Sequence, residues 1–245
     1  RSSFELTEAG QAVLESFRKI LLEYQDLLTR ISGLSQQESG EIHVGVLYYD
    51  YSSYVAKIRE ALREHYPNIR IHMHSYQPEQ IEQDLLNGKI DAAFLYGVKT
   101  LKREDISTHQ FLKIPVSIMY DKSHRFSQIF DLSVSDLAHE KILWPSCRLE
   151  LSRTADIVKA MFKKNNVHPS GYLTFDNFDD VPFLLKETGA VFISPMANQK
   201  AYPDTVECRY LEPDKWNMDI SLVWRTDNRN PAIKSLLNVL RITYP

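Results

Sequence analysis

The sequence is poor in the residues on which metal and redox chemistry usually depends. It holds only two cysteines in 245 residues, Cys147 and Cys208, and they form neither a CxxC pair nor a zinc-like spacing. Such sparing use of cysteine is typical of a reducing compartment, so we expect a cytoplasmic protein. A redox-sensing thiol at Cys147, which directly follows a predicted strand end, stays open as an alternative function.

Glycine is also scarce, with eight residues, and no GxGxxG or P-loop pattern occurs. The patterns GxSxG and HExxH are absent as well. We therefore expect no enzyme activity and no cofactor. His72 and His74 alternate on a predicted strand and share one face. With no third ligand in view, we interpret them as the polar side of that strand and predict no metal site.

Neither long apolar runs nor an excess of one charge is present. No uninterrupted apolar stretch approaches the roughly 18 residues that a membrane span needs. The formal net charge of −3 provides no global basic field to attract a nucleic-acid backbone. This chain by itself is therefore not expected to bind DNA or to span a membrane.

A long amphipathic helix is predicted from Thr7, which suits its N-cap. Its apolar residues alternate spacings of four and three, as in a coiled-coil seam, and a second column widens the stripe. The stripe consists of Val13, Leu14, Phe17, Ile20, Leu21, Tyr24, Leu27, Leu28 and Ile31. The helix ends at the Ser/Gly/Gln-rich stretch SGLSQQESGE, which is typical of a flexible linker. Because such a tether leaves the stripe without an obvious partner in the chain, we favour a partner helix and hence a homo-oligomer.

The remainder predicts an α/β fold built from two similar halves. Strands are expected at 41–49, 69–75 and 90–97, with helices at 51–68 and 78–89 between them. The second half repeats this order of strands and helices. For example, the stretch LLNGKIDAAFLYG in the first half resembles LLKETGAVFISP in the second. Alternating strands and helices indicate parallel sheets covered by helices. Two such lobes suggest a ligand cleft at the carboxyl ends of the strands.

The stretch YYDYSSY at residues 48–54 is the richest candidate for binding. It joins a predicted strand to a helix N-terminus, where free backbone N–H groups, Ser52 and Ser53 suit a carboxylate or phosphate. A serine here would also serve as an ordinary helix cap. Its tyrosines, with Tyr96 and Trp144 at two other strand ends, suggest aromatic cleft walls, although about half of the rings should point into the core.

Six stretches carry a resemblance to a known family: FELTEAG, GEIHVGV, YPNIRI, LLNGKIDAAF, DKSHRF and VSDLAHEKILW. In their order and spacing they resemble the LysR-type transcriptional regulators. The resemblance covers the whole chain. It implies two Rossmann-like lobes of the type II periplasmic-binding-protein fold, preceded by a dimerisation helix. It also implies that a winged helix-turn-helix upstream carries promoter DNA binding.

The same resemblance implies residue boundaries and a site for a small-molecule effector, such as an aromatic compound or a carboxylate. The boundaries are 1–35 for the wing end and linker helix, 36–40 for a hinge, 41–112 plus 216–245 for the first lobe and 113–215 for the second. The implied effector-binding residues are Tyr49, Asp50, Ser52, Ser53, Gln77, Pro78, Tyr96, Gly97, Trp144, Pro145, Ser146, Asn177 and Phe178.

The main alternative is a transporter's solute-binding protein with the same fold. It would need neither the wing remnant nor the coiled-coil helix, so we favour the regulator. The effector, the operator, the sign of regulation and the choice between dimer and tetramer do not follow from the sequence.

Overall fold

The computed structural model describes residues 7–11, 40–47, 54–98, 104–146, 154–194 and 204–245, together with 13, 16, 17, 20 and 24. In the first lobe and its return segment the elements are β1 (Gly40–Leu47), α2 (Tyr54–His65), β2 (Ile69–Tyr76), α3 (Pro78–Leu86), β3 (Ala92–Tyr96), β4 (Ile106–Pro115), β10 (Asn217–Arg225) and α6 (Ala232–Thr243). Between them lie β5 (Ser117–Asp121), η1 (Arg125–Gln128), η2 (Val134–Leu137), β6 (Lys141–Pro145), α4 (Thr154–Lys164), β7 (Gly171–Phe175), η3 (Phe178–Asp180), α5 (Val181–Thr188), β8 (Val191–Ser194) and β9 (Val206–Tyr210).

Two five-stranded sheets organise these elements. Sheet A has the order β2-β1-β3-β10-β4, and sheet B has the order β7-β6-β8-β5-β9. In each sheet the first three strands are parallel, as the sequence predicts, and the remaining pairings are antiparallel. Both sheets are therefore mixed rather than parallel throughout, and the predicted two-lobed α/β class is confirmed.

The edge strands β4 and β9 are not evident in the sequence. Their side chains mix polar and apolar types, as in ISTHQFLKIP, and much of each strand is only partly buried. Propensity is a weak guide for such strands because pairing with a neighbour decides their conformation. Here β10 supplies the pairing for β4, and β5 supplies it for β9.

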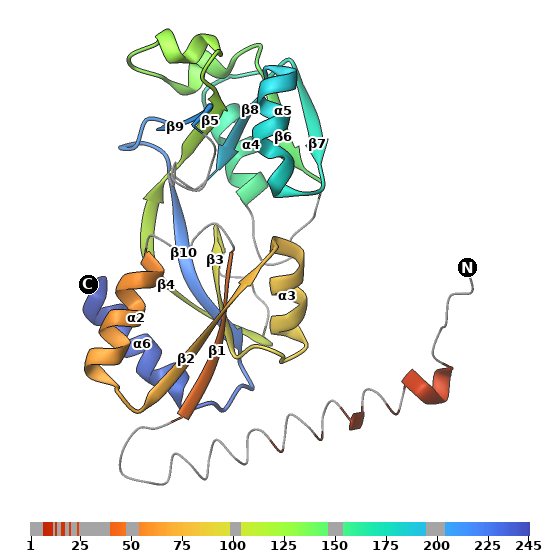
Figure 1. Ribbon diagram of the computed structural model, residues 1–245, viewed down its shortest axis with the longest axis vertical. Helices are drawn as coiled ribbons and strands as arrows, with labels where there is room; N and C mark the ends of the chain where they lie inside the picture. The colour runs from red at the N-terminus through yellow and green to blue at the C-terminus, as the bar shows by residue number, and fades with distance from the viewer. Residues whose placement is uncertain are drawn as a thin grey trace.

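Helices cover both faces of sheet A (Figure 1). On one face α2 buries Val55, Ile58 and Leu62, and it packs beside α6. On the other face α3 lies so close that a Cβ on Gly45 of β1 would come within 2.7 Å of the Ile81 side chain. Glycine at this position therefore permits the close approach of helix and strand.

Sheet B is covered in the same way. Ile142 of β6 packs in one cluster with Val158 and Met161 of α4. Its neighbour Leu143 points to the opposite face and packs in the cluster that contains Leu185 of α5. Alternation along β6 thus gives each helix its own side of the sheet.

Two chain crossings connect the sheets (Figure 1). Val116 joins β4 to β5, and the segment after β9 leads through Trp216 into β10. The two crossings bond to each other, since Val116 N donates to Trp216 O at 2.9 Å and Leu211 N donates to Val116 O at 2.8 Å. The two crossings thus form one hydrogen-bonded connection between the sheets.

The predicted residue boundaries stay a prediction. Sheet A draws on residues 40–115 and 217–225, so β4 runs three residues beyond the predicted end of the first lobe at 112. Most of the predicted linker helix and hinge lies outside the described residues. At the helix start, Thr7 acts as the predicted N-cap, since its Oγ1 accepts a hydrogen bond from Gly10 N at 3.2 Å. None of the described helices is long and apolar enough to cross a membrane.

Candidate functional site

The carboxyl ends of the parallel strands in sheet B lie next to the crossings. Ser194, the last residue of β8, pairs with Ser117, which directly follows the crossing residue Val116. Because β6 and β7 run parallel to β8, their carboxyl ends lie at this same edge.

The parallel strands of sheet A end at the crossings as well. Tyr96, the last residue of β3, pairs with Ile220 near the start of β10, four residues after Trp216. The next residue, Gly97, donates from its backbone N to Asp219 O at 2.8 Å. Strands β1 and β2 run parallel to β3, so both sheets present their carboxyl ends toward the crossings.

On the sheet A side, Gln77 is the N-cap residue of α3 and lies exposed. Its side chain makes no capping hydrogen bond, which leaves its amide available to a ligand. Pro78 is the first residue of α3, as its fixed φ predicts. Tyr96 is buried in the hydrophobic core, and Gly97 has a φ of 57°, a conformation that favours glycine.

On the sheet B side, Ser146 bridges two strand ends. Its backbone N donates to Phe175 O at 2.8 Å, and its hydroxyl donates to the Asp176 carboxylate. Asp176 was missed by the sequence analysis. It directly follows β7, and its place after a strand end is the signal that could have found it.

Trp144 lies on the α4 face of β6 and packs against the cluster on that side. Its ring makes an edge contact with the ring of Tyr172 at 5.5 Å between centroids, and Lys159 Nζ lies 5.5 Å above it. Pro145 is the last residue of β6 and is half-buried. The indole is therefore held by its own lobe, at the strand end nearest the crossings.

Asn177 and Phe178 contribute mainly to local structure. The Asn177 carboxamide oxygen accepts from Asp179 N at 3.0 Å and caps η3. The Phe178 ring is buried and meets Phe175 edge-on at 5.0 Å between centroids.

Tyr49, Asp50, Ser52 and Ser53 lie outside the described residues, and so does Cys147. The effector site as a whole therefore stays a prediction. Of its described members, the structure brings Tyr96, Gly97, Pro145 and Ser146 to the edges at the crossings. It places Gln77 at the end of β2 on the same side of sheet A.

A further phenol lies beside Gln77. Burial, followed by a hydrogen bond to the buried Asp84 carboxylate, raises the pKa of Tyr76 to about 12. Lys89 Nζ binds the same carboxylate at 2.8 Å. Tyr76 therefore remains a neutral hydrogen-bonding group at this strand end at any physiological pH.

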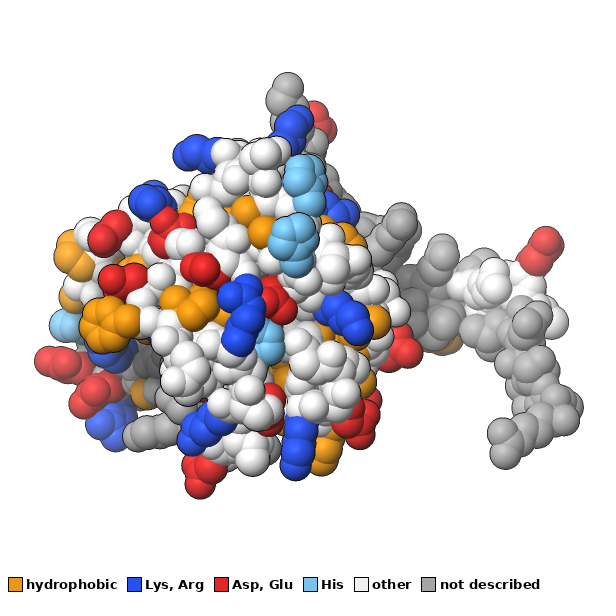
Figure 2. Space-filling model, turned by 90° about the horizontal axis from the view of Figure 1, so that it is seen from above, with side chains coloured by type: hydrophobic (Ala, Val, Ile, Leu, Met, Phe, Trp, Pro, Cys, Tyr) orange, Lys and Arg blue, Asp and Glu red, His pale blue; other side chains and the backbone are white. Residues whose placement is uncertain are grey.

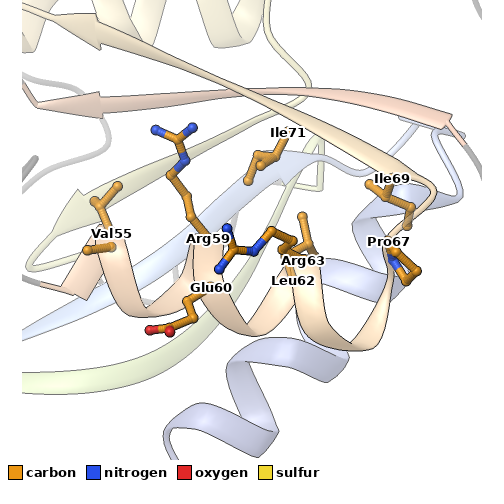
Figure 3. Close-up of a pocket in the computed structure, with 9 residues that line it drawn as sticks. Val55, Arg59, Glu60, Leu62, Arg63, Pro67, Ile69 and Ile71 are labelled. Atoms are coloured by element: carbon orange, nitrogen blue, oxygen red, sulfur yellow. The ribbon is translucent and has the colours of Figure 1, made fainter.

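A separate groove of about 500 Å³ lies between α2 and β2 (Figure 3). Arg59 and Arg63 extend from α2 along it, and Ile69 and Ile71 line it from β2. None of the described residues that line it belongs to the predicted effector-binding set. Over the end of the molecule seen in Figure 2, basic and acidic side chains are interspersed without a patch of one sign.

The chain matches the family model described as the LysR substrate binding domain over residues 35–244. Among curated proteins it is similar to the HTH-type transcriptional regulator AlsR of Bacillus subtilis (strain 168), with 21% identity over 241 residues, 96% of this chain and 77% of that protein. It also resembles a hydrogen peroxide-inducible genes activator of Pectobacterium carotovorum subsp. carotovorum, with 27% identity over 56% of this chain and 45% of the relative. The chain thus spans about half of some relatives and three quarters of another.

Solved structures support the same fold. The crystal structure of CbnR, a LysR family transcriptional regulator, superposes with a TM-score of 0.74 at 20% identity, covering 98% of this chain and 82% of that one. The effector binding domain of QuiR in complex with shikimate superposes with a TM-score of 0.69 at 18% identity, covering 84% of this chain and 98% of that one. CbnR, like AlsR, is named as a transcriptional regulator.

Proposed function

Since the chain belongs to the family of LysR substrate-binding domains, we propose that it senses a small molecule between its two sheets and passes the signal to promoter DNA. The resemblance found in the sequence is thereby confirmed, and the regulator is favoured over a transporter's solute receptor. The observation that best supports this proposal is that the parallel strands of both sheets have their carboxyl ends next to the two hydrogen-bonded crossings.

This geometry supports a closing motion about the crossings. An effector that contacts both edges at once gains contacts only when the sheets approach each other. It therefore binds the closed arrangement more tightly and shifts the population toward it. A ligand that touched one sheet alone would have equal affinity for both arrangements and would shift nothing.

The edges favour an effector with hydrogen-bond donors. The Asp176 carboxylate accepts the Ser146 hydroxyl and retains further acceptor capacity for a ligand hydroxyl or amine. Gln77 offers both a donor and an acceptor from the opposite edge. We therefore propose a small polar effector, and a carboxylate group on it would bind away from Asp176.

Self-association is proposed through the predicted helix stripe. Its described members Val13, Phe17, Ile20 and Tyr24 are helical, and each side chain is more than half exposed. Leu14, Leu21, Leu27, Leu28 and Ile31 lie outside the described residues. A row of exposed apolar side chains at coiled-coil spacing supports a partner helix from a second subunit. DNA contact would belong to the winged helix-turn-helix that the family resemblance implies, and a cytoplasmic location follows from that role.

A ligand screen by thermal shift tests the sensor proposal. The chain is melted with hydroxylated acids, amino acids, aromatic acids and cationic metabolites. A ligand present at a hundred times its Kd stabilises the folded state by about 2.7 kcal/mol. We expect a saturable shift that Ser146→Ala and Gln77→Ala both reduce and that Ser170→Ala, on a loop away from the crossings, leaves intact. A ligand whose shift ignores both edge variants would contradict binding between the sheets.

A further inference from the structure

Four polar side chains gather on one face of β1 and β2, outside the predicted effector site. Parallel pairing places His43 opposite His72 and Gly45 opposite His74. Glu41 lies two residues before His43, so all of these positions share a face. It is the face on which Ile81 of α3 covers Gly45, and Glu41 and His74 remain exposed beyond it.

The three imidazoles form a stack. The ring of His43 lies 4.7 Å from that of His72 and 5.1 Å from that of His74, with interplanar angles of 12° and 15°. His43 Nδ1 is 2.9 Å from His74 Nε2, a hydrogen bond in which one of the two nitrogens donates. This bond leaves the Nε2 of His43 free for another partner.

The fourth group is the Glu41 carboxylate, whose two oxygens have different neighbours. Arg70 Nη1 lies 3.4 Å from Oε1, and His72 Nε2 lies 3.6 Å from Oε2. The His72 Nε2 atom is buried and has no hydrogen-bond partner among the described residues. A buried imidazole nitrogen facing a carboxylate oxygen just beyond bonding distance lacks the partner that buried polar atoms normally have.

The backbone beneath this cluster is fixed from the other side. His43 N donates to Asp91 Oδ2 at 2.8 Å, and Asn230 Nδ2 donates to Glu41 O at 2.8 Å. Asn228 Nδ2 in turn binds Asp91 O at 3.0 Å. The side chains thus project from two paired strands that a neighbouring loop holds in place, which is the rigid support that a binding site needs.

We propose that Glu41, His43 and His72 form a binding site for a divalent transition-metal ion of the zinc class. One ligand atom from each lies within 4.8 Å of the others. Imidazole and carboxylate ligands suit Zn²⁺, and its ligand atoms lie about 2.0–2.2 Å from the ion. The three side chains would therefore close inward by about 1 Å on binding.

The remaining neighbours have supporting roles in this site. His74 fixes the ring of His43 through its second nitrogen, taking the place of the carboxylate, carbonyl or water that usually orients a ligating histidine. Arg70 holds Oε1 of Glu41 and leaves Oε2 for the ion. Three protein ligands leave a fourth position for water, for a ligand, or for a side chain of another subunit. The ion would join β1 to β2 across the sheet, and it would stabilise the folded chain by mass action.

The test uses the chain without a histidine tag, stripped of metal by a chelator and dialysed. Isothermal titration with Zn²⁺ at pH 7.5 should give one equivalent, and Co²⁺ should develop the visible absorption of a four-coordinate site. We expect Glu41→Gln, His43→Gln and His72→Gln each to weaken Zn²⁺ binding at least tenfold. His74→Gln should weaken it about tenfold, at the lower end of the effect of supporting residues.

His65→Gln on α2 and His168→Gln near β7 are the controls, since both remove an exposed histidine elsewhere, and they should leave the Kd unchanged. Metal-free melting curves show whether each variant is folded. Absence of Zn²⁺ binding by the unmodified chain up to millimolar concentration overturns the site. Equal binding by folded His43→Gln and His72→Gln variants overturns it as well.

Discussion

Ser146 and Asp176 are joined by a hydrogen bond between the ends of β6 and β7, with the serine hydroxyl as donor. The neighbouring strand ends are tied by the backbone as well, through Ser146 N and Phe175 O. A negative charge therefore stands at the edge of sheet B where the effector is proposed to bind. This charge selects among effectors, because it attracts donors and repels anions.

Asp176→Asn should change the charge preference of the proposed site. The amide keeps a hydrogen-bond acceptor for Ser146 but removes the charge, so anionic ligands should bind about tenfold more tightly, equivalent to roughly 1.4 kcal/mol. Titration calorimetry with one acid from the screen measures this ratio. Asp131→Asn, on the exposed loop before η2, is the matched charge control. An unchanged affinity in Asp176→Asn would place the ligand away from this edge.

Gly45→Ala should destabilise the chain through α3. The added Cβ would lie 2.7 Å from Ile81 Cγ1 and 2.7 Å from Ile90 Cδ1, and both side chains are buried. Forcing them apart should cost about 1–3 kcal/mol of unfolding free energy, measured by urea denaturation. Gly40→Ala on the same strand meets nothing within 4 Å and should change stability by less than about 0.5 kcal/mol. Equal stability of the two variants would show that α3 does not pack on β1 this closely.

Gly189→Ala tests the end of α5. Gly189 has a φ of 61° and is the left-handed C-cap of this helix. An alanine in that conformation costs about 1–2 kcal/mol, which should lower the melting temperature by a few degrees. Gly171→Ala at the start of β7 is the control, since its added Cβ meets nothing within 4 Å. A melting temperature as high as that of the control would contradict the left-handed cap.

Tyr76 should make stability depend on pH in the alkaline range. Its pKa is raised to about 12, first by burial and then by the bond to Asp84, whereas an unfolded tyrosine titrates near 10. The folded chain thus holds this proton more tightly. The resulting stabilisation is fully present below pH 10 and is lost as the pH rises toward 12. Between pH 9 and pH 11 the unfolding free energy should decrease more for the unmodified chain than for Tyr76→Phe. An equal decrease in the two proteins would disprove the pKa shift.

Cys208 should react slowly with thiol reagents. Burial raises the pKa of its thiol, so little thiolate is present at neutral pH. In a timed reaction with a thiol-specific chromogenic reagent, we expect the Cys147→Ser variant, which retains only Cys208, to react much faster after unfolding than in the folded state. Rapid reaction of Cys208 in the folded chain would contradict its burial.

Local patterns were enough to predict the strands and helices whose apolar residues form a clear run or recur at a regular spacing. The buried run IDAAFLYG became β3, and Pro67 marks the end of α2 in both sequence and structure. Each half repeats strand, helix and strand, so the two-lobed class followed from the order of elements alone. The polar edge strands β4 and β9 could not be predicted in this way. Each depends on pairing with a strand that lies far away in the sequence, β10 for β4 and β5 for β9.

Residue types at strand ends were predictable, but the direction of each side chain was not. Trp144 and Phe178 sit where the sequence places them, yet their rings pack on Tyr172 and Phe175 within their own lobe. Alternation alone fixes that neighbouring rings point to opposite faces. Which face is the core depends on the helix that covers it.

The sequence by itself determined the fold class and the family, because periodicity and motif order are local properties of the chain. It also showed that His72 and His74 share one face of a strand. Only the tertiary structure decided that His43 and Glu41 lie beside them, since the register between β1 and β2 places His43 against His72. A register between strands separated by a helix depends on packing across the whole sheet, and no short stretch of sequence contains it.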